Sequence, residues 1–229
     1  MDLPVQLDSV LLPSGWLRPL NCSGLHARRL HELQWVERTR SWEKTMPVSE
    51  TTFRQVALED PEGHWELYCG ELRRKPGMSA AHNELTSVLH YELMRQLDRS
   101  QFSVRSNAGH VHLPERSYYI PDVFVVPREL LRPLLPKREL EWYTVPLPLV
   151  VEIWSPSTGQ FDVETKLREY QRRGDSEIWR LHPYEKSLTT WRRQTDGSYV
   201  EASYTGGTIE PIALPGVTID LNALFADAA

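Results

Sequence analysis

Two carboxylates and one ammonium occupy positions where the surrounding pattern calls for apolar residues: Asp122, Glu152 and Lys166. Glu152 interrupts an apolar run at residues 149–154, and such a run is typical of a strand covered on both faces. Asp122 stands directly ahead of a second apolar run, at residues 123–126. A carboxylate taken out of water in such a place costs several kcal/mol unless a cation or a hydrogen-bond network meets it. The two acids therefore predict a buried site that binds a cation.

Lys166 belongs to a predicted helix whose apolar stripe consists of Val163, Leu167 and Tyr170. At spacings of three and four residues, Lys166 lies beside that stripe and is aimed inward. Tyr170 shares the face of Lys166, and we interpret it as a packed ring that positions the lysine. The two carboxylates and this ammonium together predict a divalent-metal site with a basic partner.

The chemistry that suits such a site is phosphodiester hydrolysis. Magnesium takes oxygen ligands, usually one or two carboxylates together with waters and phosphate oxygens. The metal offsets charge on the phosphate and lowers the pKa of a bound water. Lys166 would orient or activate that water and stabilise the developing negative charge. The alternative is a buried Asp/Glu–Lys ion pair with a structural role alone, and the charge pattern by itself leaves both interpretations open.

The order of these residues carries a resemblance to a known family. The segments are Pro-Asp at 121–122, Val-Glu-Ile-x-Ser-Pro-Ser at 151–157 and Lys-Leu-x-x-Tyr at 166–170. This order resembles the Uma-type endonuclease family of bacteria, within the PD-(D/E)XK restriction-endonuclease-like superfamily. The resemblance runs from about Met46 to Phe225. It implies an α/β fold with a restriction-endonuclease-like core.

The resemblance also implies roles for individual residues. Asp122, Glu152 and Lys166 would be the catalytic set, and Asp122 and Glu152 would hold a metal together with the main-chain carbonyl of Ile153. The implied metal is Mg²⁺, with Mn²⁺ as a substitute, and the implied partner is DNA. Monomer and homodimer both stay open.

Two positions depart from the expected pattern. In the superfamily a lysine usually stands two residues after the second acid, and Trp154 occupies that position here. The Uma-type pattern places the lysine on the following helix, so Lys166 takes the role by similarity. His182 stands where the family usually has an aspartate before a proline.

Two further side chains are weaker candidates for accessory roles. Glu71 lies in a family-like Gly-Glu-Leu segment, and it either helps to hold a metal or faces solvent at a strand end. His82 begins a predicted helix on its inward side, three residues before Leu85. A lone histidine in such a place is more often a hydrogen-bonded structural group than a ligand or base. Contact of His82 with the substrate is the alternative.

The elements that position these residues can be predicted from hydrophobic periodicity. A long helix is expected at 79–99, followed by a meander of three strands at 102–106, 110–113 and 118–126. The strand of Glu152 and the helix of Lys166 come next, and further strands are expected at 177–181, 188–193 and 198–204. This alternation predicts an α/β fold with a central mixed β-sheet flanked by helices.

Residues 1–45 differ from the rest, because they hold scattered prolines and show no sustained periodicity. We expect a poorly ordered N-terminal extension there and one restriction-endonuclease-like domain at 46–229. The 229 residues suit a single domain of ordinary size.

Composition limits the classes of function. No apolar run approaches the ~20 residues that span a bilayer, and no signal-peptide pattern opens the chain, so we expect a cytoplasmic protein without membrane contact. The net charge of −5 argues against indiscriminate binding to nucleic acid. Basic residues that could meet a phosphate backbone, or form only solvated surface, are Arg73, Arg74, Lys75, Arg128, Arg132, Lys137, Arg138, Arg168, Arg172 and Arg173.

The sequence thus predicts a Mg²⁺-dependent DNA endonuclease of the restriction-endonuclease-like fold. The alternative from another class is a catalytically inactive nucleic-acid-binding or interaction domain with the same fold. A third interpretation is a small-molecule phosphohydrolase, which the acidic net charge favours slightly and the order of the motifs does not.

Overall fold

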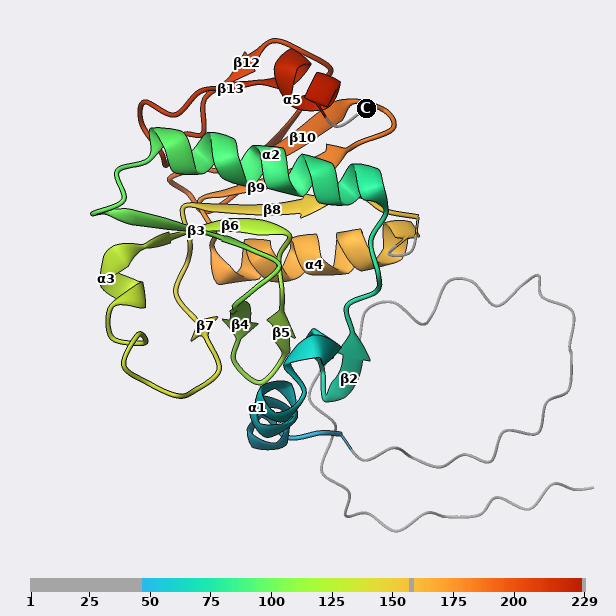
Figure 1. Cartoon of the computed structure of the whole chain (residues 1–229), viewed down its shortest axis with the longest axis vertical. Helices are drawn as coiled ribbons and strands as arrows, with labels where there is room; N and C mark the ends of the chain where they lie inside the picture. The colour runs from blue at the N-terminus through green and yellow to red at the C-terminus, as the bar shows by residue number, and fades with distance from the viewer. Residues whose placement is uncertain (1–46, 157–158, 228–229) are drawn as a thin grey trace, which may run out of the picture. The chain divides into compact units, whose positions relative to one another are not determined.

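A mixed six-stranded sheet lies at the centre of the fold (Figure 1). The computed structural model describes residues 47–156 and 159–227, with the side chains of 159–163 and 227 left out. The strand order is β11-β10-β9-β8-β6-β3, and only β8 and β9 run parallel. The bounds are β3 Phe102–Ser106, β6 Val123–Pro127, β8 Leu149–Ile153, β9 Glu177–His182, β10 Ser187–Arg193 and β11 Tyr199–Tyr204.

Two helices cover the two faces of this sheet: α2 (Ala80–Gln96) and α4 (Gly159–Arg173). Figure 1 shows α2 above the strands and α4 below them. Side chains alternate along a strand, so β8 sends Val151 into the cluster beneath α2 and Val150 into the cluster beside α4. Both faces are therefore apolar, which explains the uninterrupted apolar runs of the central strands.

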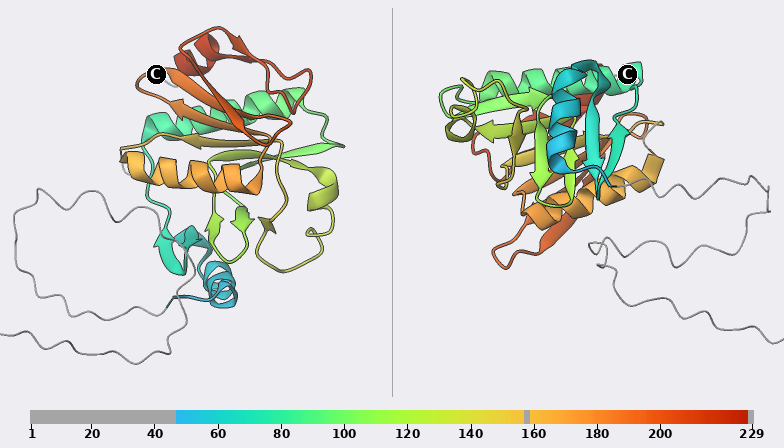
Figure 2. Two further views of the ribbon diagram at one scale, coloured as in Figure 1. Left: turned by 180° about the vertical axis from the view of Figure 1, so that it is seen from behind. Right: turned by 90° about the horizontal axis from the view of Figure 1, so that it is seen from below.

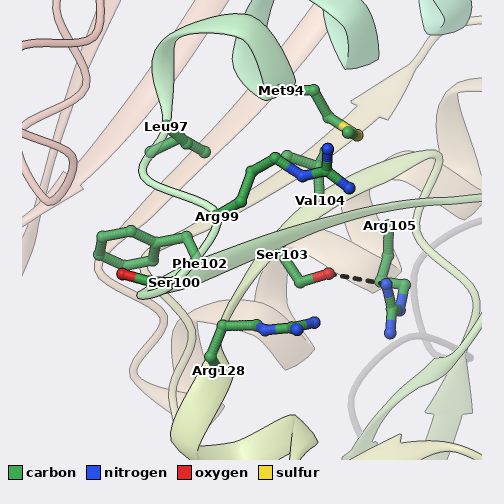
Figure 3. Close-up of a pocket in the computed structure, with 9 residues that line it drawn as sticks. All are labelled: Met94, Leu97, Arg99, Ser100, Phe102, Ser103, Val104, Arg105 and Arg128. Atoms are coloured by element: carbon green, nitrogen blue, oxygen red, sulfur yellow. Dashed lines mark hydrogen bonds between the residues drawn. The ribbon is translucent and has the colours of Figure 1, made fainter.

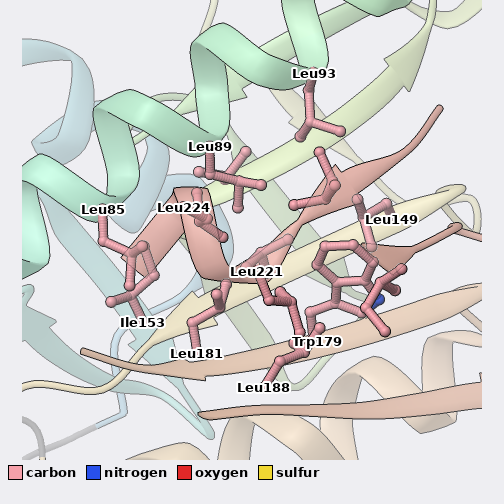
Figure 4. Close-up of a cluster of buried hydrophobic side chains, with 14 of the residues drawn as sticks. Leu85, Leu89, Leu93, Leu149, Ile153, Trp179, Leu181, Leu188, Leu221 and Leu224 are labelled. Carbon is pink, nitrogen blue, oxygen red and sulfur yellow. The ribbon is translucent and has the colours of Figure 1, made fainter. Parts of the chain in front are cut away.

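Helix α2 is capped by Ser79. The Ser79 hydroxyl accepts a hydrogen bond from the His82 amide at 3.3 Å. Leu85, Leu89 and Leu93 recur every four residues and are fully buried against the sheet. Figure 4 shows these leucines above strands of the six-stranded sheet and beside α5 (Leu221–Asp227). The helix expected at 79–99 is confirmed as α2.

The parallel pair β8–β9 is joined by α4, which makes a β–α–β unit. Because the helix returns the chain across the sheet face, the α4 side chains lie over the strand that carries Glu152. Arg173, near the end of α4, is buried rather than part of a basic surface. It pairs with Asp175 at 3.1 Å and donates to the carbonyls of His112 and Tyr143.

A second, five-stranded sheet has the order β2-β1-β5-β4-β7. Helix α1 packs on it through Phe53, which is buried with Leu67 and Tyr118. The remaining elements are α1 Glu50–Glu59, η1 Pro61–Gly63, β1 Trp65–Tyr68, β2 Glu71–Arg74, β4 His110–Leu113, β5 Ser117–Tyr119, α3 Arg128–Leu131, β7 Trp142–Tyr143, β12 Thr208–Ile209 and β13 Ile219–Asp220. Figure 2 shows this smaller sheet beside the central one.

The predicted three-strand meander is wrong. The segment expected as one strand at 118–126 divides into β5, which joins the second sheet, and β6, which joins the central sheet. Pro121 lies at the division, and proline cannot donate to a strand ladder. Strand β3 pairs with β6, so Phe102 lies opposite Pro127. The chain therefore crosses between two sheets immediately before Asp122.

Residues 1–46 lie outside the described residues, so the N-terminal extension and its boundary stay a prediction. Among the described residues, no helix is long and apolar enough to cross a membrane. The predicted α/β fold, with a mixed central sheet flanked by helices, is confirmed.

Candidate active site

Asp122 is fixed at the start of β6 by main-chain groups. Its own carbonyl accepts from the Asn107 amide at 3.0 Å, and its Oδ2 accepts from the Ile153 amide at 2.6 Å. The side chain is buried, with a relative exposure of 2%. The break between β5 and β6 thus places a carboxylate inside the protein at the end of β8.

Two cationic or ionisable side chains meet the Asp122 carboxylate. Lys75 Nζ lies 2.7 Å from Oδ1, and His82 Nε2 lies 3.0 Å from Oδ2. Lys75 also donates to Asn107 Oδ1 at 2.8 Å and to the Ile120 carbonyl at 2.9 Å, so three acceptors surround an ammonium with three protons. Burial by itself raises the pKa of Asp122, but Lys75 and His82 outweigh it and hold that pKa below its ordinary value. Asp122 is therefore an ionised carboxylate.

Glu152 faces Asp122 across the β6–β8 ladder. Val123 pairs with Val151, and the same antiparallel register brings the next positions outward, Asp122 and Glu152, opposite each other. The Tyr170 hydroxyl donates to Glu152 Oε1. Burial raises the pKa of Glu152 to about 7; the Asp122 charge adds to this rise and the nearby lysines oppose it. Near neutral pH the Glu152 carboxyl is thus poised between its two protonation states.

Lys166 reaches from α4 to the same place. Its Nζ lies 3.6 Å from Glu152 Oε1 and donates to Glu66 Oε1 at 2.8 Å. Burial by itself lowers the pKa of Lys166, but Glu152 and Glu66 more than offset it and raise that pKa above its ordinary value. The Tyr119 ring centroid lies 5.3 Å from the ammonium. Lys166 is a charged, buried group held between two carboxylates.

Glu66 and Lys75 belong to this cluster, and the sequence analysis did not select them. Glu66, on β1, also accepts from the Ile120 amide at 2.9 Å. Lys75 looked like one of several surface cations, yet its side chain is only 5% exposed. Glu66 is a charged residue within the short apolar strand β1, and this pattern could have indicated that it is a site residue. Lys75 stands in a run of basic residues, which gives no such indication.

The other predicted site residues fall into two groups. His82 and Tyr170 lie in the cluster, as described, and the Ile153 amide is hydrogen-bonded to Asp122. Glu71 does not join them, since its side chain is 64% exposed and pairs with Arg73 at 2.6 Å. The structure thus favours the solvent-facing interpretation of Glu71.

The two positions that depart from the family pattern touch each other. The rings of Trp154 and His182 stack with centroids 4.4 Å apart and an interplanar angle of 24°. Trp154 is half-buried beyond the end of β8. The pair covers the side of the strand end where a lysine would stand in the superfamily pattern.

The residues present fit a hard divalent cation by their chemistry. Asp122 and Glu152 supply two carboxylates from paired strands, and Asp122 repels the ionised form of Glu152. A cation between them would relieve this repulsion, and oxygen ligands are what Mg²⁺ prefers. Among the described residues no group of three or more His, Cys, Asp or Glu side chains is gathered as a metal site. The coordination of a cation bound by the two carboxylates would therefore be completed by main-chain, water or substrate oxygens.

A mixed sheet whose two faces are covered by helices in this arrangement is the restriction-endonuclease-like fold. The solved structure of a "putative nuclease belonging to DUF820" from Anabaena variabilis matches it with a TM-score of 0.63 and 14% sequence identity. The match covers 73% of this chain and 93% of that chain. Residues 51–222 match the Uma2 family, described as "Putative restriction endonuclease", and the chain belongs to that family. No curated protein matches the chain.

Proposed function

We propose that this protein is a Mg²⁺-dependent DNA endonuclease that hydrolyses phosphodiester bonds, with Mn²⁺ as a substitute metal. The observation that carries the proposal is the convergence of Asp122, Glu152 and Lys166, which come from three elements and meet in one buried cluster. Membership of a family described as restriction endonucleases supports the same reaction class. The proposal includes action in the cytoplasm, where the DNA of a bacterial cell lies, and leaves monomer and homodimer open.

Asp122 and Glu152 would hold the metal, with the Ile153 carbonyl as a third ligand. The metal would supply an activated water and offset charge on the phosphate. The Asp122 carboxylate is ionised without further change, because Lys75 and His82 hold its pKa low. Glu152 has a pKa of about 7, so metal binding at neutral pH takes the place of a proton there.

Lys166 would stabilise the negative charge that develops on the phosphate oxygens. Its ammonium is positioned by Glu66 at 2.8 Å and lies farther from Glu152, at 3.6 Å. Glu66 therefore acts as a positioning residue, which keeps the ammonium at the site when Glu152 turns to a metal. Tyr170 would serve the same purpose for Glu152 through its hydroxyl hydrogen bond.

The second candidate is an inactive nucleic-acid-binding or interaction domain. One observation favours it: the charges of the cluster already pair with one another. In an inactive domain this pairing would be the final state of the site. In an endonuclease it is the metal-free state, from which Mg²⁺ displaces some of the partners.

The deciding experiment is cleavage of supercoiled plasmid and of single-stranded DNA in Mg²⁺, Mn²⁺ or EDTA. The wild type is compared with Asp122→Asn, which keeps the shape of the side chain beside Lys75 and the Ile153 amide. We expect cleavage in either metal, none in EDTA, and a loss of roughly 1,000-fold in the variant. Glu71→Gln, at an exposed carboxylate outside the cluster, is the matched control. Cleavage that survives both EDTA and Asp122→Asn contradicts the proposal, and no cleavage by the wild type supports the inactive domain.

A further inference from the structure

A cavity of about 660 Å³ lies along β3, the edge strand of the six-stranded sheet. It is lined by the end of α2, by β3 and by the start of α3 (Figure 3). Strand β3 pairs with β6 from Phe102↔Pro127 to Ser106↔Val123, so the lining residue Phe102 and the cluster residue Asp122 belong to opposite ends of this ladder. The size is that of a small-molecule site.

The lining is strongly basic. Arg99, Arg105 and Arg128 line the cavity, and no Asp or Glu among the described residues does. Arg105 shares its charge with Glu141 at 2.7 Å, which stands outside the lining. Across residues 47–156 and 159–227, neither Arg99 nor Arg128 forms a salt bridge. The lining is therefore positively charged, although the chain carries a net charge of −5.

One guanidinium nitrogen in this lining lacks an acceptor. Arg128 Nε is buried and has no hydrogen-bond partner in the described part of the chain. Buried donors are nearly always satisfied, and a buried donor without an acceptor is unfavourable. The guanidinium groups of the lining can pair with an anion in the cavity, because their planar shape suits the paired oxygens of a phosphate.

The cavity also has an apolar side. Figure 3 shows Leu97 and Phe102 on one side and the guanidinium groups of Arg99, Arg105 and Arg128 on the other. A ligand that uses both sides carries a phosphate at one end and a flat apolar group at the other. An aromatic ring beside arginines is the arrangement on which a nucleic-acid base stacks while its phosphate is bound.

We propose that this cavity binds a nucleotide unit, with its phosphate on the arginines and its base against Leu97 and Phe102. A free mononucleotide and a nucleotide within a strand share this chemistry. The site shares no residue with the carboxylate cluster, and the proposal does not depend on nuclease activity. Its rival is a protective role, because charges beside an edge strand such as β3 prevent pairing with other chains.

The test is calorimetry in EDTA, in which metal-dependent binding at the carboxylate cluster is removed. The titrants are adenosine 5′-monophosphate, inorganic phosphate, adenosine and a 5′-phosphorylated oligothymidine. The variants are Arg99→Gln and Arg128→Gln. Arg95→Gln is the control, since Arg95 is an exposed arginine on α2 that pairs with Glu92 outside the cavity. Thermal unfolding of each variant checks that it is folded.

We expect the monophosphate to bind at least about tenfold more tightly than inorganic phosphate or adenosine alone. Arg99→Gln and Arg128→Gln should each weaken it by roughly tenfold or more, and Arg95→Gln by less than about twofold. On addition of the monophosphate, the amide resonances of Phe102–Ser106 should shift in the NMR spectrum, and that of Ile153 should not. Tighter binding of the oligothymidine than of the monophosphate identifies a strand as the source, and equal or weaker binding identifies a free nucleotide.

Three results would overturn the proposal. If no titrant binds, the remaining role of the arginines is to prevent β3 from pairing with other chains. Equal affinity for the monophosphate in Arg128→Gln and Arg95→Gln places its binding elsewhere. Equal affinity for the monophosphate and inorganic phosphate shows that the apolar side is not used.

Discussion

The carboxylate cluster has two halves, one around Asp122 and one around Glu152. Both carboxylates are buried, but their pKa values are shifted in opposite directions. Asp122 receives the Lys75 ammonium, the His82 imidazole and a main-chain amide, and its pKa is lowered. Glu152 stands opposite it and receives a hydroxyl and a more distant ammonium, and burial raises its pKa to about 7. Burial is similar in the two halves, so the partners decide the charge state.

In the proposed endonuclease, this difference would let the site take up a metal without an unpaired buried charge beforehand. The Asp122 half is neutralised by groups of the protein, chiefly Lys75. The Glu152 half is partly protonated near neutral pH, and in the proposed endonuclease a divalent cation would take the place of that proton. The hydrogen bond from Lys166 to Glu66 would hold the ammonium in place with or without a bound metal.

The largest effect is expected from Lys166→Met, which changes the Glu152 half of the cluster. Methionine keeps much of the apolar stem, so the helix should still pack, while the ammonium beside Glu152 is lost. We expect the DNA cleavage rate to fall about 1,000-fold, equivalent to about 4 kcal/mol of transition-state stabilisation. Single-turnover plasmid cleavage measures this fall. Lys137→Met, at a half-exposed lysine 4.0 Å from Glu139, is the control. A rate within a few-fold of wild type would leave Lys166 with a structural role only.

Lys75→Met removes the resident cation from the other half. The buried Asp122 carboxylate would lose its closest partner, so we expect the metal-free protein to lose roughly 3 kcal/mol of unfolding free energy. The same change should raise Mg²⁺ affinity about tenfold, because a divalent cation no longer competes with an ammonium. Urea denaturation in EDTA and calorimetry with Mg²⁺ measure the two effects. Unchanged or weaker metal binding would contradict the view that Lys75 occupies the charge-balancing place of the metal.

The raised pKa of Glu152 predicts a pH dependence of stability in EDTA. The folded pKa of about 7 exceeds the ordinary value of 4.5, so the folded protein binds more protons than the unfolded chain between these values. The Glu152 contribution is therefore fully present below about pH 4.5 and is lost as pH rises through about 7, by on the order of 3 kcal/mol at most. Urea denaturation at about pH 5 and about pH 8 measures it.

Glu152→Gln is the control for this dependence. Glutamine cannot ionise, so the part of the pH slope that Glu152 supplies should vanish, and the variant should be more stable than wild type at about pH 8. An identical slope in wild type and variant would show that Glu152 keeps an ordinary pKa despite its burial.

The smallest effect is expected outside both halves. Glu71→Gln changes an exposed carboxylate whose partner is Arg73, so the cleavage rate and Mg²⁺ affinity should stay within about twofold of wild type. Plasmid cleavage and calorimetry under the conditions used for Lys166→Met make the comparison direct. A tenfold loss in either quantity would restore Glu71 as a residue of the site.

Local patterns determined much of this protein without any structure. The four-residue spacing of leucines and the Ser79 cap define α2, since both depend on residues close in sequence. The apolar run around Glu152 identified a buried strand with a misplaced charge. Asp122, Glu152 and Lys166 were selected in this way, and the structure brings them together.

Pairings between distant segments were decided only by the tertiary structure. Lys166 and its partner Glu66 are 100 residues apart in sequence. No local period indicates which strand faces α4, or that Lys75 turns inward while Glu71 remains in solvent. The predicted three-strand meander is wrong for the same reason. No local pattern indicates that the strands before and after Pro121 belong to two different sheets. Spacing fixes which face a residue takes on its own element, whereas the partner across that face depends on how the whole chain packs.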